Sequence, residues 1–113
     1  MHSIVYASDP DAARAFFRDV LRLPYVDAHD GWLIFKLPPS ELGVHPAEGE
    51  AGTHELYLMC DDIEATMADL AARGAEFAGP VRQAGFGLVT AIVIPGGGQI
   101  GLYQPSHETA YDL

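Results

Sequence analysis

Apolar and polar positions follow a pattern that occurs twice along the chain. An apolar run at residues 2–7 predicts a strand. Asp9-Pro10 then marks a helix start, because the Asp carboxylate can accept free N–H groups and proline fits the first helical turn. The next apolar residues recur at the spacing of one helix face and stop before Pro24. They are Ala13, Phe16, Phe17, Val20 and Leu21.

Three short strands are predicted after this helix. Residues 25–28 and 32–37 are apolar runs joined by His29-Asp30-Gly31, where glycine can supply the positive φ of a hairpin turn. Residues 42–45 give the third strand. Residues 47–52, rich in Ala, Glu and Gly, then predict a linker.

The same order of elements begins again after the linker. Residues 54–60 predict an apolar strand, and Asp61 and Glu64 stand at the spacing of a capping box at the start of a second helix. The second helix should end at Gly74 and be followed by three more strands. Its predicted buried face is Ile63, Met67, Leu70 and Ala71, and the strands are 75–81, 88–94 and 99–103, with a tight turn at Pro95–Gly98. The two copies align so that Asp9 falls on Asp62, each at a strand-to-helix junction.

These elements predict one α+β domain at residues 1–106, built from two tandem βαβββ modules. The modules are residues 1–46 and 53–105, and residues 107–113 form a polar tail. Strand alternation turns the side chains of Leu56, Leu58 and Cys60 toward the second helix and those of Glu55, Tyr57 and Met59 away from it. Curved mixed sheets with helices on their outer face would leave concave free faces that form a pocket.

Composition and charge restrict the partners of such a domain. The 113 residues carry a net charge of −10, which disfavours nucleic acid and acidic membrane surfaces, and no apolar run reaches the ~20 residues of a membrane span. The single cysteine, Cys60, excludes an internal disulfide and is predicted to be a structural residue. We therefore expect a cytoplasmic protein that binds neither nucleic acid nor membrane.

The duplicated pattern resembles the vicinal oxygen chelate superfamily, which includes glyoxalase I, extradiol dioxygenases and bleomycin resistance proteins. The resemblance covers most of the chain and implies the glyoxalase/bleomycin resistance/dioxygenase fold. The segments that carry it are Asp9-Pro10 with Phe16-Phe17, Leu21–Pro24, Asp61–Ala65, Arg73–Phe77, Pro95–Gly98 and Leu102–Pro105.

The resemblance also implies a divalent metal held by one residue from each of the first, fourth, fifth and eighth strands. The matching positions here are His2, Gly43, Glu55 and Gly101, so two of the four positions lack a side-chain donor. His45 lies two residues after Gly43 and offers a substitute. His2, His45 and Glu55 would then resemble a two-His–one-carboxylate set.

Aromatic residues indicate a different kind of site, because flat ligands bind well against aromatic side chains. The candidate ligand-binding residues are Tyr6, Trp32, His45, Tyr57, Phe86 and Tyr103.

Two functions therefore remain open. The first is a protein that binds a small cationic or aromatic molecule in a concave pocket without the family's full metal site, comparable to bleomycin resistance proteins. The second is a metal-dependent lyase, isomerase or dioxygenase with Zn, Ni, Mn or Fe at His2, His45 and Glu55, in which Glu55 or a water moves the proton. The missing ligands disfavour glyoxalase I and extradiol dioxygenase activity. The resemblance further implies a homodimer.

Overall fold

The computed structural model describes residues 1–111 and 113. Asp112, part of the predicted tail, lies outside the described residues. The elements are α1 (Pro10–Ala15), continued by the π-helical turn η1 (Phe16–Val20), β1 (Tyr25–Asp27), β2 (Leu33–Phe35), β3 (Tyr57–Met59), α2 (Ile63–Ala72), β4 (Arg82–Ala84), β5 (Gly87–Ile94) and β6 (Gly98–Pro105). No helix in the described part of the chain is both long and apolar enough to cross a membrane.

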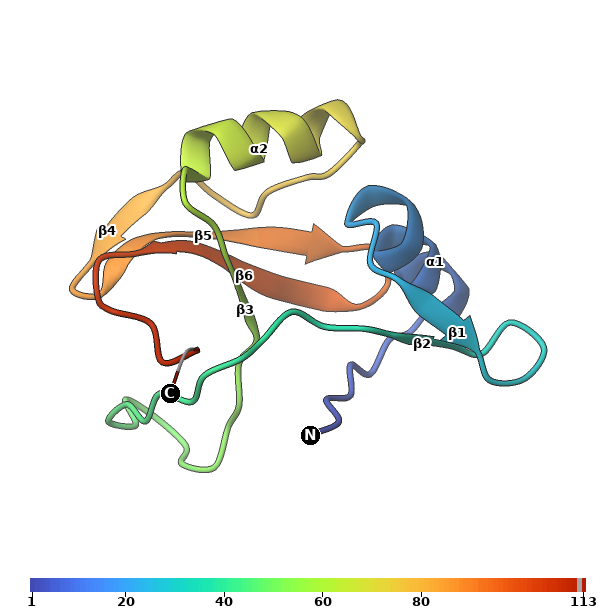
Figure 1. The fold of residues 1–113 in the computed structure, drawn as a ribbon, viewed down its shortest axis with the longest axis horizontal. Helices are drawn as coiled ribbons and strands as arrows, with labels where there is room; N and C mark the ends of the chain where they lie inside the picture. Colours follow the sequence, from blue (N-terminus) through green and yellow to red (C-terminus); the bar gives the residue numbers. More distant parts are fainter. Residues whose placement is uncertain (112) are drawn as a thin grey trace.

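The strands form one mixed sheet and one hairpin, which confirms the predicted α+β class. The sheet has the order β3-β6-β5-β4, with β3 parallel to β6 and the other pairs antiparallel, and β1 pairs with β2 in the hairpin. Helix α2 covers one face of the sheet, and the chain between β2 and β3 runs on the other side (Figure 1). The core lies between the two helices and the long strands β5 and β6, and consists of Ala13, Phe16, Ile63, Leu70, Ile92, Ile94, Ile100 and Leu102.

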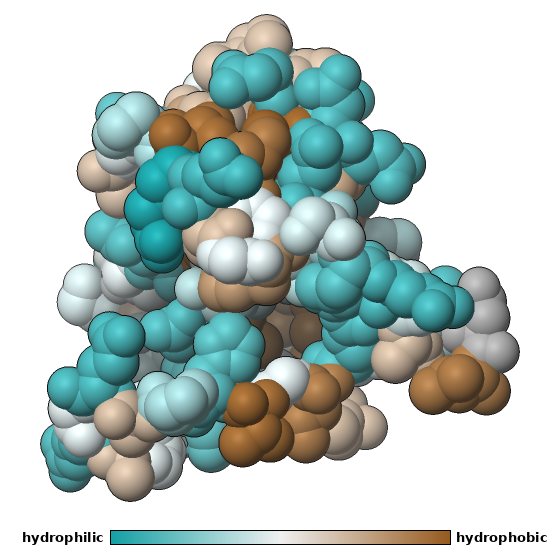
Figure 2. Space-filling view, turned by 90° about the vertical axis from the view of Figure 1, so that its left-hand side faces the viewer, coloured by the Kyte–Doolittle hydropathy of each residue, from teal (hydrophilic) through white to brown (hydrophobic). Residues whose placement is uncertain are grey.

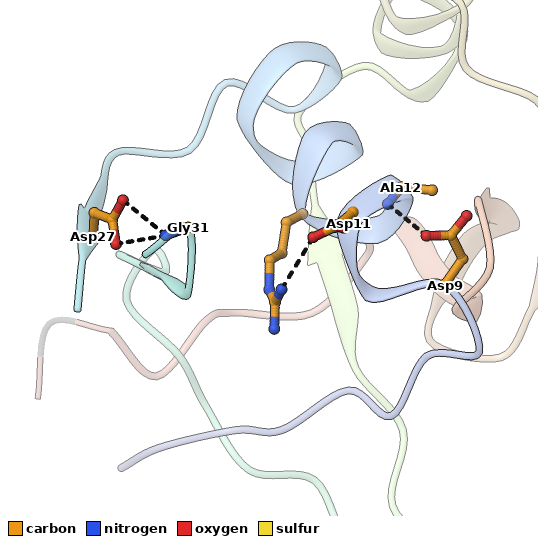
Figure 3. Close-up of polar contacts among 6 residues, drawn as sticks. Asp9, Asp11, Ala12, Asp27 and Gly31 are labelled. Atoms are coloured by element: carbon orange, nitrogen blue, oxygen red, sulfur yellow. Dashed lines mark hydrogen bonds and ion pairs between the residues drawn. The ribbon is translucent and has the colours of Figure 1, made fainter. Parts of the chain in front are cut away.

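Both helices begin in the same way, as the alignment of Asp9 with Asp62 predicts. The Asp9 carboxylate accepts the N–H of Ala12 at 3.1 Å (Figure 3), and the Asp62 carboxylate accepts that of Ala65 at 3.1 Å. The capping box predicted at Asp61 is wrong, because Asp62 is the residue that caps α2.

The helix faces are largely those that the sequence predicts. The apolar residues of the first helix are buried or half-buried against the core. In α2, Ile63 and Leu70 are buried and Met67 packs against them, but Ala71 is exposed. Each residue rotates the helix by about 100°, so Ala71 already lies past the edge of the buried stripe.

Two strands predicted in the first module are not formed. Residues 2–7 and 42–45 are extended chain, and their side chains remain largely in solvent, with Tyr6 and Val44 each 88% exposed. A strand needs a hydrogen-bonded neighbour, and neither segment has one in the described part of the chain. The strand predicted at 54–60 shortens to β3, whose three residues pair in register with β6 and are flanked by backbone hydrogen bonds of Leu56 and Cys60 with β6.

The strand predicted at 75–81 is also interrupted. The N–H of Ala78 and the carbonyl of Glu76 bond to β5, and Phe77 forms an isolated bridge with Ile92. Gly79-Pro80 then breaks the ladder, because proline has no N–H to donate, and pairing resumes only at β4.

The β5–β6 turn joins the second module to the first. The N–H of Ser8 donates to the Gly96 carbonyl at 2.6 Å. Gly96 has a φ of +67°, and a Cβ on it would lie 2.6 Å from the Cβ of Asp9. The N-terminus of α1 therefore sits directly on this turn, and only glycine leaves room for it.

Candidate ligand-binding site

Four aromatic side chains from separate segments form one cluster on the free face of the sheet. His45 and Phe86 have ring centroids 5.4 Å apart, Phe86 and Tyr103 5.5 Å, and Tyr103 and Tyr57 5.6 Å, all in edge-to-face geometry. Such pairs contribute about 0.5–1.5 kcal/mol each beyond burial. The structure thus brings together four of the six predicted ligand-binding residues, and we call His45, Tyr57, Phe86 and Tyr103 the aromatic cluster.

The other two candidates lie outside the cluster. Tyr6 is 88% exposed on the N-terminal segment. Trp32 is at the β1–β2 hairpin, where the guanidinium carbon of Arg14 lies 4.7 Å from the ring centroid. Neither side chain contributes to the surface around Tyr103.

A carboxylate borders the cluster at Tyr57. The Tyr57 hydroxyl donates to Oε2 of Glu55 at 2.7 Å. This hydrogen bond raises the pKa of Tyr57, and burial raises it further. The hydroxyl therefore stays protonated at neutral pH and acts as a donor, and Glu55 is its acceptor rather than an isolated base.

Tyr57 also explains the glycine at position 101. Tyr57 and Gly101 are register partners on β3 and β6. A Cβ on Gly101 would lie 2.2 Å from Cδ1 of the Tyr57 ring and 2.4 Å from Cε1. The ring lies where a side chain at position 101 would begin. Gly43 differs, because a Cβ there would meet only the His45 ring, at an ordinary 3.6 Å.

The C-terminal segment lies against the other side of the cluster. The Tyr103 hydroxyl and Nε2 of His107 are 3.0 Å apart, and Nε2 lies 3.7 Å from Oε1 of Glu41. The Ala110 N–H donates to Glu41 at 2.8 Å, and the Tyr111 hydroxyl donates to the Met59 sulfur at 3.4 Å. Burial and the negative charge of Glu41 raise the pKa of Tyr103.

Sequence reasoning missed Glu41 and His107. No periodic pattern marks either residue, and they meet only because the segments around residues 41 and 107 lie together in the fold. The position of Glu41 two residues before Gly43 was the one available signal.

A cleft of about 660 Å³ opens beside the cluster. It is lined by Glu55, Tyr57 and Gly101, by Arg82 of β4, and by apolar residues that include Ile4 and Val5 of the first module. A cleft between the two modules was expected from the concave sheet faces. Seen from the side of β4, the molecule is hollowed below its main body, with hydrophobic side chains gathered at the lower border (Figure 2).

A second concavity of about 440 Å³ lies between α1 and the β1–β2 hairpin. Its charged groups already have partners within the protein. Arg14 pairs with Asp11 at 3.4 Å, and both carboxylate oxygens of Asp27 accept the Gly31 N–H at 3.1 Å (Figure 3). The cleft beside the aromatic cluster is therefore the better candidate for ligand binding.

The three proposed metal ligands have other surroundings. His45 packs against Phe86, Glu55 accepts from Tyr57, and His2 is an exposed residue of the N-terminal segment. Over the residues that the structure describes, no three or more His, Cys, Asp or Glu side chains group in a way that could hold a metal ion. The residues present do not fit the metal that the family implies.

Cys60 lies on the helix side of β3, as predicted. Its thiol donates to the Tyr103 carbonyl at 3.6 Å, and burial raises the pKa of the thiol. A thiol that stays protonated is a poor nucleophile, so this geometry supports a packing role.

The protein thus combines helices α1 and α2 with a mixed sheet and a hairpin, and has a cleft beside its aromatic cluster. A family model described as the Glyoxalase/Bleomycin resistance protein/Dioxygenase superfamily matches residues 1–97. The chain belongs to this superfamily. A search of curated proteins finds no match.

Solved structures of the same fold include proteins described in different ways. An antibiotic binding protein, TnmS3, from Streptomyces sp. CB03234 is 26% identical with a TM-score of 0.64, over 90% of this chain and 91% of that one. A glyoxalase/bleomycin resistance protein from the same organism is 25% identical with a TM-score of 0.58, over 88% and 95%. A lactoylglutathione lyase from Agrobacterium tumefaciens is 22% identical with a TM-score of 0.66, over 92% and 91%, which supports the fold alone.

Proposed function

We propose that this protein binds a flat, aromatic small molecule in the cleft beside the aromatic cluster, without the family's full metal site. The observation that carries the proposal is a cleft of about 660 Å³ lined by Tyr57, whose ring belongs to the aromatic cluster and packs against Tyr103. Mainly apolar clefts with a few polar groups are typical of ligand sites. The similarity to a protein described as antibiotic binding supports the proposal.

Isothermal calorimetry with a panel of planar aromatic compounds tests this function. Tyr57→Ala removes the member of the cluster that lines the cleft and should weaken any binding about tenfold, since a stacking contact contributes roughly 1 kcal/mol or more. Tyr6→Ala is the matched control, because Tyr6 is exposed and outside the cluster. No binding by any compound, or equal loss in both variants, would contradict the proposal.

The alternative function, a metal-dependent enzyme, is tested by a separate measurement. Elemental analysis of protein purified without chelators, followed by thermal unfolding with added Zn, Ni, Mn or Fe, decides it. A bound metal near one equivalent that is lost in His45→Ala would replace the proposal with a lyase, isomerase or dioxygenase that uses His2, His45 and Glu55, with Glu55 as the proton acceptor.

We also propose a cytoplasmic homodimer. Large apolar side chains are exposed on the two segments that do not form strands, including Ile4 at 63% and Leu42 at 87%. The outer edge of β3 has no partner strand in the part of the chain that the structure describes. Pairing of two copies would cover these groups. Light scattering at micromolar concentration tests the dimer, and a monomer there would refute it.

A further inference from the structure

We infer that the Tyr57 ring has closed the family's eighth-strand ligand position, and that Tyr57 and Glu55 make the cleft a site for a protonated amine on an aromatic body. The inference rests on the proposed function and adds the chemistry of the ligand.

Steric contact between neighbouring strands carries the first step. Position 101 is where the family's metal ligand would stand, and its register partner is Tyr57. Real Cβ atoms essentially never approach other heavy atoms within 3.0 Å, yet a Cβ at position 101 would have three Tyr57 ring atoms at 2.2, 2.4 and 2.8 Å. No larger residue fits at position 101 while the ring stays in place.

Two contacts hold the ring against Gly101. The Tyr57 hydroxyl donates to Glu55 at 2.7 Å, and the ring packs edge-to-face on Tyr103, with an interplanar angle of 89°. The Tyr103 side chain is itself buried. The ring is therefore fixed at both ends, and a substitution at position 101 must break at least one of these contacts.

The polar groups of this arrangement indicate the ligand. A carboxylate has about four acceptor positions, so Glu55 can accept from Tyr57 and still accept an N–H of a ligand. An ammonium group there would lie beside the Tyr57 ring, and aromatic faces attract cations. Arg82 lines the same cleft and is the charge that opposes a cation. Its removal should therefore strengthen amine binding.

The closed position is tested without a ligand by a double-mutant cycle on Gly101→Ala and Tyr57→Ala. Gly101→Ala alone should lower the Tm by about 5 °C or more. In the Tyr57→Ala background the same change should cost less than half as much, because the ring is gone. Gly43→Ala is the control, since its Cβ meets only an ordinary contact.

Additive effects of the two substitutions on the Tm, or an equal loss of Tm in Gly43→Ala, would overturn the inference that the Tyr57 ring closes position 101. If Gly101→Ala does not fold, the double variant decides: it should fold, and its failure to fold would also overturn the inference.

The ligand class is tested with 2-naphthylmethylamine and its neutral counterpart 2-naphthylmethanol. The amine should bind about tenfold more tightly, as a charge-assisted hydrogen bond would give. Glu55→Gln should bring the affinities of the two probes within about threefold of each other, and Arg82→Gln should tighten the binding of the amine only.

Equal binding of the two probes, or a preference that survives Glu55→Gln, would overturn the amine assignment. If neither probe binds, the amine assignment is also overturned. If none of the planar aromatic compounds of the calorimetry panel binds either, the proposed function is refuted as well. Nickel chloride alone should not shift the Tm. A shift that Glu55→Gln abolishes would overturn the inference that the metal position is closed.

Discussion

Gly96→Ala is the substitution that most directly tests how the two modules are joined. The β5–β6 turn carries Gly96 with a φ of +67°, and an added Cβ would lie 2.6 Å from the Cβ and 3.0 Å from the nitrogen of Asp9. Asp9 caps α1 and cannot move away without losing its hydrogen bond to Ala12.

The expected loss is the sum of two effects. Alanine at a left-handed φ costs about 1–2 kcal/mol relative to glycine. Displacing Asp9 removes a cap that contributes about 1 kcal/mol. The free energy of unfolding should therefore fall by about 2–3 kcal/mol, which is a large part of a typical domain's stability. The Ser8–Gly96 hydrogen bond, at 2.6 Å, would be disturbed as well.

Gly98→Ala separates the two effects. Gly98 lies in the same turn with a φ of +79°, but a Cβ there meets nothing within 4 Å. Gly98→Ala should therefore lower the free energy of unfolding only by the cost of the left-handed φ, about 1–2 kcal/mol. Urea unfolding followed by circular dichroism measures both variants, with unchanged slopes required for the comparison. Equal losses in Gly96→Ala and Gly98→Ala would refute the close approach of α1 to the turn.

Three further predictions concern the core, a cap and a titrating group. Ile92→Ala should lower the free energy of unfolding by about 2–5 kcal/mol in urea titrations, because Ile92 is fully buried. Leu113→Ala, at an exposed position outside the proposed dimer contact, should change it by less than about 0.5 kcal/mol, and similar losses in the two variants would contradict the assigned core. Asp62→Ala should cost about 1 kcal/mol by the same assay and reduce helix protection in hydrogen exchange, and an unchanged stability would show that the cap bond contributes nothing. The Tyr57 pKa is raised in the folded state above its ordinary 10.0, so its contribution is fully present below pH 10 and is lost as the pH rises through the folded value. Tyr57→Phe should therefore flatten the fall of stability above pH 10, and a fall as steep as in the parent protein would argue against the Glu55 contact.

Much of the fold could be predicted because it depends on local patterns. The Asp9 and Asp62 caps, the apolar helix faces and the β5–β6 hairpin each follow from residues close together in sequence, and the structure confirms them. The strands at 2–7 and 42–45 were wrong because an apolar extended segment becomes a strand only beside a hydrogen-bonded partner. The sequence pattern does not show that this partner is missing.

The candidate site shows the same limit. Alternation along residues 54–60 put Tyr57 and Glu55 on one face, and the structure agrees, but their hydrogen bond was not predictable. Tyr6 and Trp32 were grouped with the cluster on residue type alone, and they lie elsewhere, because aromatic character does not specify which segments meet.

The sequence by itself determined the α+β class, the resemblance to this superfamily and the absence of metal-binding side chains at positions 43 and 101. Only the tertiary structure decided that the two glycines have different surroundings, with an ordinary contact to the His45 ring at Gly43 and the Tyr57 ring pressed against Gly101. The physical reason is distance along the chain. Periodicity and capping act within a few residues, whereas the contact between Tyr57 and Gly101 depends on the parallel register of β3 and β6, which forms only when the sheet assembles.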